Sequence, residues 1–212
     1  MYIDAYAHLY QKINGFKIVV NTKEGELKGF LSLKPSTRST YDIAMRDATI
    51  DGLITFDEIE KVRPGQIFYK ENNPNELFIF QSINEFEFQI NTRNINAIKQ
   101  NCFVDVKRKV FNEKTGDEEY QNMYTDLVSF VSMLNKDEKN FAAGIEDNTN
   151  INIQIPKRDL EENIYVIENG DLIILKNFKK DFSKEIKVES IDAFGVPGII
   201  RIFGTYDTRT GE

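Results

Sequence analysis

Residues 62–69 read VRPGQIFY, and residues 167–174 read IENGDLII. In both stretches a glycine is followed by one polar residue and three apolar or aromatic residues, which is typical of a turn that opens a β-strand. A second pair of stretches follows after a polar loop: residues 77–84, LFIFQSIN, and residues 185–192, EIKVESID. Both of these end in Ser-Ile followed by Asn or Asp. The recurrence predicts that the chain holds two copies of one β unit.

The match extends toward the start of each half. Residues 16–33 place the polar turn NTKEGE between two apolar runs, which predicts a β-hairpin. Residues 128–145 place the similar turn NKDEKN between two apolar runs, so we match this segment to the first hairpin. We expect each half to close with one further strand, at residues 102–106 in the first half and 199–203 in the second.

These patterns predict a mainly β fold of two tandem small β-barrel or sandwich units. The first unit takes residues 1–110 and the second takes residues 111–212, with the boundary in the polar stretch at residues 112–117. The alternative is that any two all-β segments resemble each other this much by chance.

Single elements follow from local patterns. Residues 85–90 and 151–155 alternate polar and apolar side chains, as half-buried strands do. Pro156 should end the second of these strands. Pro197 and Gly198 suit the two central positions of a type II turn, which requires a positive φ angle at the glycine.

Helical patterns are few. Residues 2–13 carry apolar side chains spaced near 3.6, which predicts a short N-terminal helix. Residues 120–134 fit either a helix or a strand, and we expect a short helical start followed by a strand from about Leu127. Residues 55–58, TFDE, resemble a capping box that opens a helical turn before Gly65.

Composition limits the classes of function. The chain of 212 residues is 41% hydrophobic, with 16 Phe and 9 Tyr to bury, so it is not a disordered sequence. It has one cysteine and one histidine, and it lacks the Gly-rich phosphate-binding motifs and the HExxH metal motif. No apolar run reaches the roughly 20 residues of a membrane helix. We therefore expect a protein that is not an enzyme, has no cofactor or metal and does not bind a membrane.

Charge is shared unevenly between the halves. Residues 1–110 carry 15 Lys and Arg against 14 Asp and Glu, whereas residues 111–212 carry 12 against 20. The acidic half could steer assembly of the protein or face a DNA-filled lumen. Alternatively, it is a solvated surface that keeps the protein soluble. The net charge of −7 excludes a chain whose whole surface binds nucleic acid.

Four isolated features could belong to a site, and each has an ordinary structural explanation. His8 is expected to pack beside tyrosines, and Cys102 is expected to be a buried small apolar residue. Glu146, Asp147, Asn148 and Asn150 lack the spacing of a Ca²⁺ loop, so they are expected to form a polar loop. Residues 107–109, KRK, could touch DNA phosphates, but three charges make a weak site, and a solvated edge is the expectation.

Residues 153–204 carry a resemblance to a known family. They contain a strand ending in Pro156, a turn at Gly170-Asp171, a Val-Glu-Ser strand at residues 188–190 and a last strand before the C-terminus. This order resembles the head-closure and head–tail joining proteins of tailed bacteriophages, which are small β-barrels. The first half repeats the pattern more weakly, with Gln66 in place of the Asp and without the terminal Pro. A double-length chain departs from the usual single-domain member of that family.

The resemblance implies a non-enzymatic ring subunit of the head–tail connector, or neck. Such a subunit would form a homo-oligomeric ring, contact the portal or adaptor and the tail proteins of the same virion, and help retain packaged DNA. Any contact with that DNA would be non-specific. Its location would be the virion, after assembly in the cytoplasm of the host bacterium.

A long polar segment, residues 34–52, is the expected docking loop. Its apolar side chains should dock into a neighbouring subunit while its two arginines pair with carboxylates at the rim, which gives these subunit-interface candidates: Arg38, Tyr41, Ile43, Met45 and Arg46. A second set should be critical for turns: Gly65, Gly170, Pro197 and Gly198. Among turn residues, substitution of Gly170 is expected to cost more stability than substitution of Asp171.

Two other functions remain open. One is another assembly protein of a phage, from the tail, the baseplate or the capsid surface. The other is a cytosolic β-rich adaptor, or an enzyme whose site has no recognised motif.

Overall fold

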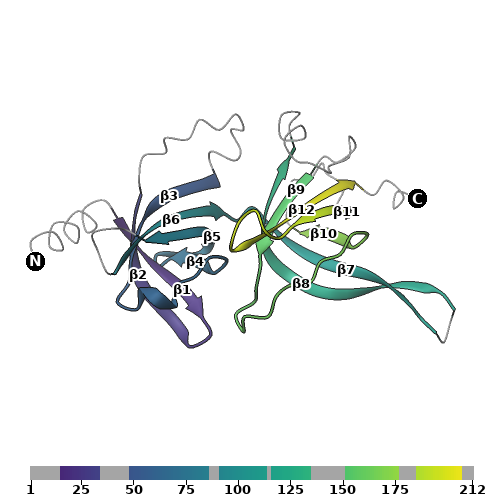
Figure 1. Cartoon of the computed structure of the whole chain (residues 1–212), viewed down its shortest axis with the longest axis horizontal. Helices are drawn as coiled ribbons and strands as arrows, with labels where there is room; N and C mark the ends of the chain where they lie inside the picture. The colour runs from purple at the N-terminus through teal and green to yellow at the C-terminus, as the bar shows by residue number, and fades with distance from the viewer. Residues whose placement is uncertain are drawn as a thin grey trace, which may run out of the picture. The chain divides into compact units, whose positions relative to one another are not determined.

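A computed structural model describes residues 15–33, 48–85, 91–113, 116–134, 151–176 and 185–206. Within these ranges the chain forms two closed β-barrels, each of six antiparallel strands (Figure 1). The predicted mainly β fold of two tandem units is therefore confirmed, and both units are barrels. No helix in the described ranges is long and apolar enough to cross a membrane.

The first barrel contains the strands β1 to β6, which follow one another around it in the order β1-β2-β3-β6-β5-β4. Their bounds are β1 (Gly15–Thr22), β2 (Gly25–Leu33), β3 (Thr49–Thr55), β4 (Ile67–Lys70), β5 (Asn73–Glu85) and β6 (Thr92–Lys99). A short 3₁₀ helix, η1 (Ile59–Lys61), precedes β4.

The second barrel repeats this arrangement with the strands β7 to β12 in the order β7-β8-β9-β12-β11-β10. Their bounds are β7 (Cys102–Phe111), β8 (Glu118–Met133), β9 (Ile151–Pro156), β10 (Leu172–Lys176), β11 (Glu185–Asp192) and β12 (Ile199–Tyr206). Adding six to each strand number of the first barrel gives the strand order of the second. The topology is therefore duplicated.

One local structure shows the duplication residue by residue, and we call it the turn–bulge unit. In the first barrel, Gly65 has a φ of 90°. Its N–H donates to the Phe80 carbonyl at 2.7 Å, and the Phe80 N–H donates to the Gln66 carbonyl at 3.0 Å. The Gln66 side chain accepts the Arg63 N–H at 2.9 Å. The pairing of β5 with β6 is bulged between Phe80 and Ser82.

The turn–bulge unit of the second barrel has the same bonds. Gly170 has a φ of 91°. Its N–H donates to the Val188 carbonyl at 2.8 Å, and the Val188 N–H donates to the Asp171 carbonyl at 2.9 Å. The Asp171 side chain accepts the Glu168 N–H at 2.8 Å. The bulge lies between Val188 and Ser190. The two sequence matches from which the duplication was inferred therefore coincide in structure.

The two barrels fill equivalent interiors with different side chains. The first core is built around three stacked rings, in which Phe68 lies 5.1 Å from Phe78 and 4.3 Å from Phe80 between centroids. The second core is aliphatic, and Val188 takes the place of Phe80. Each such side chain, fully buried, contributes about 1.5–3 kcal/mol. A closed barrel also leaves no strand edge in its wall.

The boundary between the units lies earlier than the sequence indicates. The stretch 112–117 falls between β7 and β8, which pair with each other inside the second barrel, and β7 also pairs with β10. The change of barrel falls between Lys99 and Cys102. Residues 102–106 are thus the first strand of the second barrel and not the last strand of the first, a place that β6 takes.

The hairpin match also needs correction. The hairpin at residues 16–33 is confirmed as β1–β2, but its equivalent is β7–β8 and not residues 128–145. Residues 141–145 lie outside the described residues. The expected helical start at residue 120 is wrong, because β8 is a strand from Glu118 onward, held by pairing with β7.

Of the other local predictions, some are confirmed and some are wrong. A helical turn does precede Gly65, but η1 has no side-chain cap, and Thr55 bonds to Thr92 in the sheet instead of forming a capping box. The strand at residues 151–155 is confirmed and extends to Pro156, although both its faces are buried. Residues 49–52 of the expected docking loop belong to β3. The expected helix at residues 2–13 and the strand at 86–90 lie outside the described residues.

The turn at Pro197 and Gly198 is present but is not of type II. The Ile199 N–H donates to the Val196 carbonyl at 3.2 Å, which closes a four-residue turn. Gly198 is not among the described glycines with positive φ, and a type II turn requires a positive φ there.

Two glycines provide a matched test of the turn–bulge unit. Gly170 and Gly116 both have positive φ, and a Cβ added at either meets no atom within 4 Å. We expect Gly170→Val to lower the free energy of unfolding by about 1–2 kcal/mol, because a β-branched residue is strained in this conformation. Gly116→Val should lower it clearly less, since the exposed hairpin tip can relieve strain by local fraying. Urea unfolding of both variants measures this, and equal losses would contradict the role given to the turn–bulge unit.

Candidate interaction surface

The outer half of the β7–β8 hairpin in the second barrel is largely exposed. The two strands pair from Cys102 opposite Ser129 to Phe111 opposite Glu118. Beyond Lys107, however, β7 has no register partner in β10, and β8 pairs with β9 only from Phe130 onward. The hairpin therefore continues as a two-stranded ribbon that extends away from the other strands of its barrel (Figure 1).

One face of this ribbon combines aromatic and charged side chains. Lys109 lies opposite Tyr120, and Phe111 lies opposite Glu118, so these four side chains share a face. Phe111 is 60% exposed and Tyr120 is 46% exposed. Lys109 forms an ion pair with Glu118 between the two rings. Exposed aromatic residues are typical of protein-binding surfaces.

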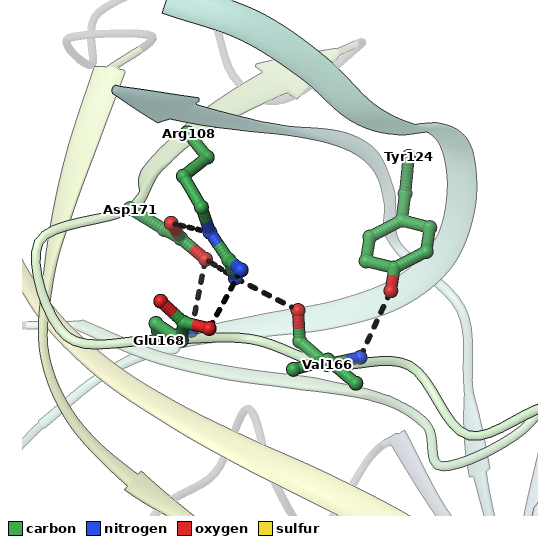
Figure 2. A network of polar contacts seen from close by, with 5 residues as sticks. All are labelled: Arg108, Tyr124, Val166, Glu168 and Asp171. Carbon is green, nitrogen blue, oxygen red and sulfur yellow. Dashed lines mark hydrogen bonds and ion pairs between the residues drawn. The ribbon is translucent and has the colours of Figure 1, made fainter. Parts of the chain in front are cut away.

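The root of the ribbon is fixed by an ion pair between Arg108 and Asp171 (Figure 2). Arg108 Nε donates to Asp171 Oδ1 at 2.8 Å, and Nη2 donates to Oδ2 at 2.8 Å, which makes the pair bidentate. Asp171 is only 2% exposed, and the Arg108 side chain is 20% exposed. Hydrogen bonding to Asp171 raises the pKa of Arg108.

The same arginine holds the loop that leads into β10. Arg108 Nη1 donates to Glu168 at 2.7 Å, and Nη2 donates to the Val166 carbonyl at 3.0 Å. The Tyr124 hydroxyl accepts the Val166 N–H at 3.0 Å, as Figure 2 shows. The Tyr124 ring meets Tyr165 edge to face, with centroids 5.0 Å apart. Both strands of the ribbon are thus fastened to this loop of their own barrel.

A second fixed point lies where the ribbon meets the barrel wall. Lys176 Nζ lies 2.7 Å from Asp105 Oδ1 and 2.9 Å from Asp126 Oδ1. Its hydrogen bonds to these carboxylates raise the pKa of Lys176. Asp126 has a φ of 55°, and its N–H donates to Asp105 at 2.9 Å, beside a bulge in the β7–β8 pairing. The bulge redirects β8 as it leaves the barrel.

The loop between β11 and β12 presents a second exposed aromatic residue. Asp192 Oδ1 accepts the N–H groups of Phe194 and Gly195 at 3.0 and 2.8 Å. Phe194 is 92% exposed. The bonds from the Gly195 and Phe194 N–H groups lower the pKa of Asp192. The carboxylate therefore orders the backbone that carries the exposed ring.

The predicted site residues fall into two groups. Those of the docking loop and two of the isolated features lie outside the described residues: Arg38, Tyr41, Ile43, Met45, Arg46, His8, Glu146, Asp147, Asn148 and Asn150. The turn residues Gly65 and Gly170 lie in the turn–bulge units, and Pro197 and Gly198 lie in the turn before β12.

The other two features lie in β7. Cys102 is buried, as expected, and burial raises the pKa of its thiol. In the KRK run, Arg108 and Lys109 both form ion pairs within the second barrel. Within the described ranges, no group of three or more His, Cys, Asp or Glu side chains is placed to hold a metal ion.

The sequence does not predict the ribbon or the ion pair between Arg108 and Asp171 at its root. The helical spacing of residues 120–134 concealed the long strand β8. A signal for the ion pair was present, because Asp171 stands where the other copy has Gln66. Its partner Arg108 could be assigned only once β7 had been placed in the second unit.

Comparisons of the chain with protein-family models, with curated proteins and with solved structures find no match.

Because of the ion pair at the root, we expect substitution of Asp171 to cost more stability than substitution of Gly170. This is the reverse of the order expected from the sequence. We expect Asp171→Asn to lower the free energy of unfolding by about 3 kcal/mol, since it leaves Arg108 without its buried charged partner. This exceeds the loss expected for Gly170→Val. The neighbouring surface pair provides a control, because Lys109→Gln should cost less than about 1 kcal/mol. Urea unfolding compares the three variants, and a loss for Asp171→Asn as small as that for Lys109→Gln would contradict the role of the ion pair.

The Asp192 turn should give a measurable pH dependence. Its pKa in the folded protein is lowered below the unfolded value of about 3.9, so its stabilisation is present above that pH and is lost as the pH falls through the folded pKa. A carboxyl NMR titration should therefore place the Asp192 midpoint below that of ordinary aspartates. Asp192→Asn, which keeps an accepting oxygen, should remove this acid-range dependence of stability. A midpoint at or above about 3.9 would contradict the prediction.

Proposed function

We propose that this chain is a non-enzymatic structural protein of a tailed bacteriophage, a ring subunit of the head–tail connector. In this role it would join the portal to the tail and help retain packaged DNA. The observation that carries the proposal is the tandem pair of closed barrels of one topology, of which the second carries an exposed ribbon.

A closed barrel suits an assembly subunit. Its wall has no free strand edge, which prevents unspecific edge-to-edge association. Specific contacts then come from loops and extensions, which can vary without disturbing the core. The exposed aromatic residues of the ribbon and Phe194 lie on such elements.

Two divergent copies of one barrel also give one chain two unlike surfaces. A ring subunit needs two different complementary faces, because a head-to-tail contact joins different patches. Residues 1–100 carry 12 Lys and Arg against 13 Asp and Glu, whereas residues 101–212 carry 15 against 21. The two halves thus differ in net charge, −1 against −6, so a contact between two acidic second halves is the most strongly repelled.

The resemblance in residues 153–204 supports the same function. Its strand ending in Pro156, its Gly170-Asp171 turn and its last two strands all belong to one small closed barrel. Small β-barrels are the fold that the resemblance implies. On this proposal, residues 34–47 dock onto the portal, the adaptor or the tail proteins, and the protein resides in the virion.

Assembly of the purified full-length chain tests the proposal. Sedimentation velocity and native mass spectrometry, with and without the portal protein, should find a closed oligomer of one copy number that appears as a ring in electron micrographs. Labelled particles should carry it between portal and tail. A chain that stays monomeric under both conditions would contradict the proposal and favour an adaptor or enzyme. Labelling at the baseplate, tail tube or capsid surface would favour another phage assembly role.

A further inference from the structure

The first barrel shows how much of the β7–β8 hairpin the fold needs. Phe68 and Ile173 each lie three residues after the glycine of the turn–bulge unit. Phe68 pairs with Val20 in β1, and Ile173 pairs with Val106 in β7. Val20 and Val106 are therefore equivalent positions. Two residues after Val20 and Val106 come Thr22 and Arg108, which are therefore also equivalent. The two hairpins correspond up to these positions.

Beyond these positions the two hairpins differ. Thr22 pairs with Gly25, so the first barrel closes its hairpin with the two residues 23–24. Arg108 pairs with Gln121, so the second barrel places residues 109–120 in the same interval. The first barrel closes completely without such an extension. Closure of the fold therefore does not require residues 109–120, and we call this segment the arm.

The described part of the arm is exposed and is held in a fixed direction. Residues 116–120 are all exposed, as are Lys109 and Phe111. The arm begins directly after Arg108, whose bidentate bonds to the buried Asp171 fix its base. A rigid base reduces the conformational entropy lost on binding.

We infer that the arm binds the first barrel of a second copy of this chain, in a head-to-tail contact. The inference rests on the proposed ring assembly and names the surfaces that form it. The arm belongs to the second barrel and its target to the first, so each copy offers one arm and one target. Such a contact repeats from copy to copy and closes into a ring when the rotation allows.

The charge of the arm is complementary to that of a group of lysines on the first barrel, which indicates where the arm binds. The arm carries Lys109 and Lys114 against Glu113, Asp117, Glu118 and Glu119, a net charge of −2. On the first barrel, two carboxylates are each shared by two lysines. Lys17 and Lys28 lie 3.7 and 3.0 Å from Glu71.

The second shared carboxylate is Glu76, five residues after Glu71 in the chain. Lys70 and Lys99 lie 2.9 and 2.5 Å from Glu76. We call these four lysines the lysine cluster: Lys17, Lys28, Lys70 and Lys99. Glu26, which accepts a hydrogen bond from Tyr69, lies beside Lys28, and the cluster with its three carboxylates keeps a net charge of +1.

The target also offers one partly exposed aromatic ring. Lys70 Nζ lies 4.8 Å from the centroid of the Phe16 ring, which is only partly buried. The arm brings Phe111 and Tyr120 together with its carboxylates, and in the lysine cluster the ammonium group of Lys70 lies over the Phe16 ring. Both surfaces thus mix aromatic rings with charges, and the charges are of opposite sign.

Replacing the arm by the turn of the first barrel tests whether assembly needs it. In the arm-swap variant, Lys-Glu-Gly takes the place of residues 109–121, and the glycine provides the positive φ found at Gly25. Circular dichroism and melting temperature should match the full-length chain, while the oligomer seen by sedimentation velocity should be lost. If the variant does not fold, the double variant Phe111→Ser with Tyr120→Ser replaces it, because both side chains are exposed.

Cross-linking between two differently marked populations tests the target. Tyr120→Cys chains are mixed with Lys28→Cys chains and treated with a short bis-maleimide, and the native Cys102 does not compete because it is buried. We expect a covalent dimer in this mixture. The control mixture of Phe194→Cys with Lys28→Cys should give at least tenfold less dimer, although Phe194 is the more exposed ring.

The outcomes separate the inference from the proposed function. If the full-length chain forms the ring and the arm-swap variant forms it equally well, the arm inference is wrong and the ring assembly stands. If the ring needs the arm but the two mixtures cross-link equally, the lysine cluster is not the target and the inference is also wrong. If the full-length chain forms no oligomer with or without the portal protein, the proposed function itself fails.

Discussion

Closure of each barrel depends on one backbone arrangement, a glycine with positive φ that bonds to a bulged residue in the next strand. Gly65 and Gly170 make this bond to Phe80 and Val188. The bulge increases the local twist, and a small barrel needs strong twist and strand tilt to close. Because the bonds join main-chain atoms, they survive replacement of the side chains around them. The interior has therefore been able to diverge to stacked phenylalanines in one barrel and aliphatic side chains in the other.

Outside this shared backbone arrangement, the second copy has features that the first lacks. Asp171 replaces Gln66 and becomes the buried partner of Arg108, while the hairpin that begins at Arg108 is lengthened. The two changes are physically linked. A long two-stranded ribbon is only marginally stable by itself, and a bidentate ion pair at its base fixes its direction. The first copy retains a tight turn and needs no such anchor.

The sequence predicts the duplication because the turn–bulge unit has a readable pattern: glycine, polar residue, apolar strand, and later a Ser-Ile ending. It misplaces the boundary because only two residues, Gln100 and Asn101, separate the end of β6 from the start of β7. The hairpin turn at residues 112–117 is longer and more polar than this true junction, so it resembles a linker. The sequence does not reveal all of strand β8, because the outer half of this strand is exposed and packs on no hydrophobic core. Its apolar residues therefore do not alternate regularly with polar ones.

The candidate surface was harder to foresee, because it depends on pairings between residues about 60 positions apart, such as Arg108 with Asp171. The most direct test of the proposed assembly is a cryo-electron microscopy map of the assembled protein in which strands are resolved. We expect a ring in which the arm of each copy contacts the lysine cluster of the next copy. A ring whose ribbon tips all end in solvent would contradict it.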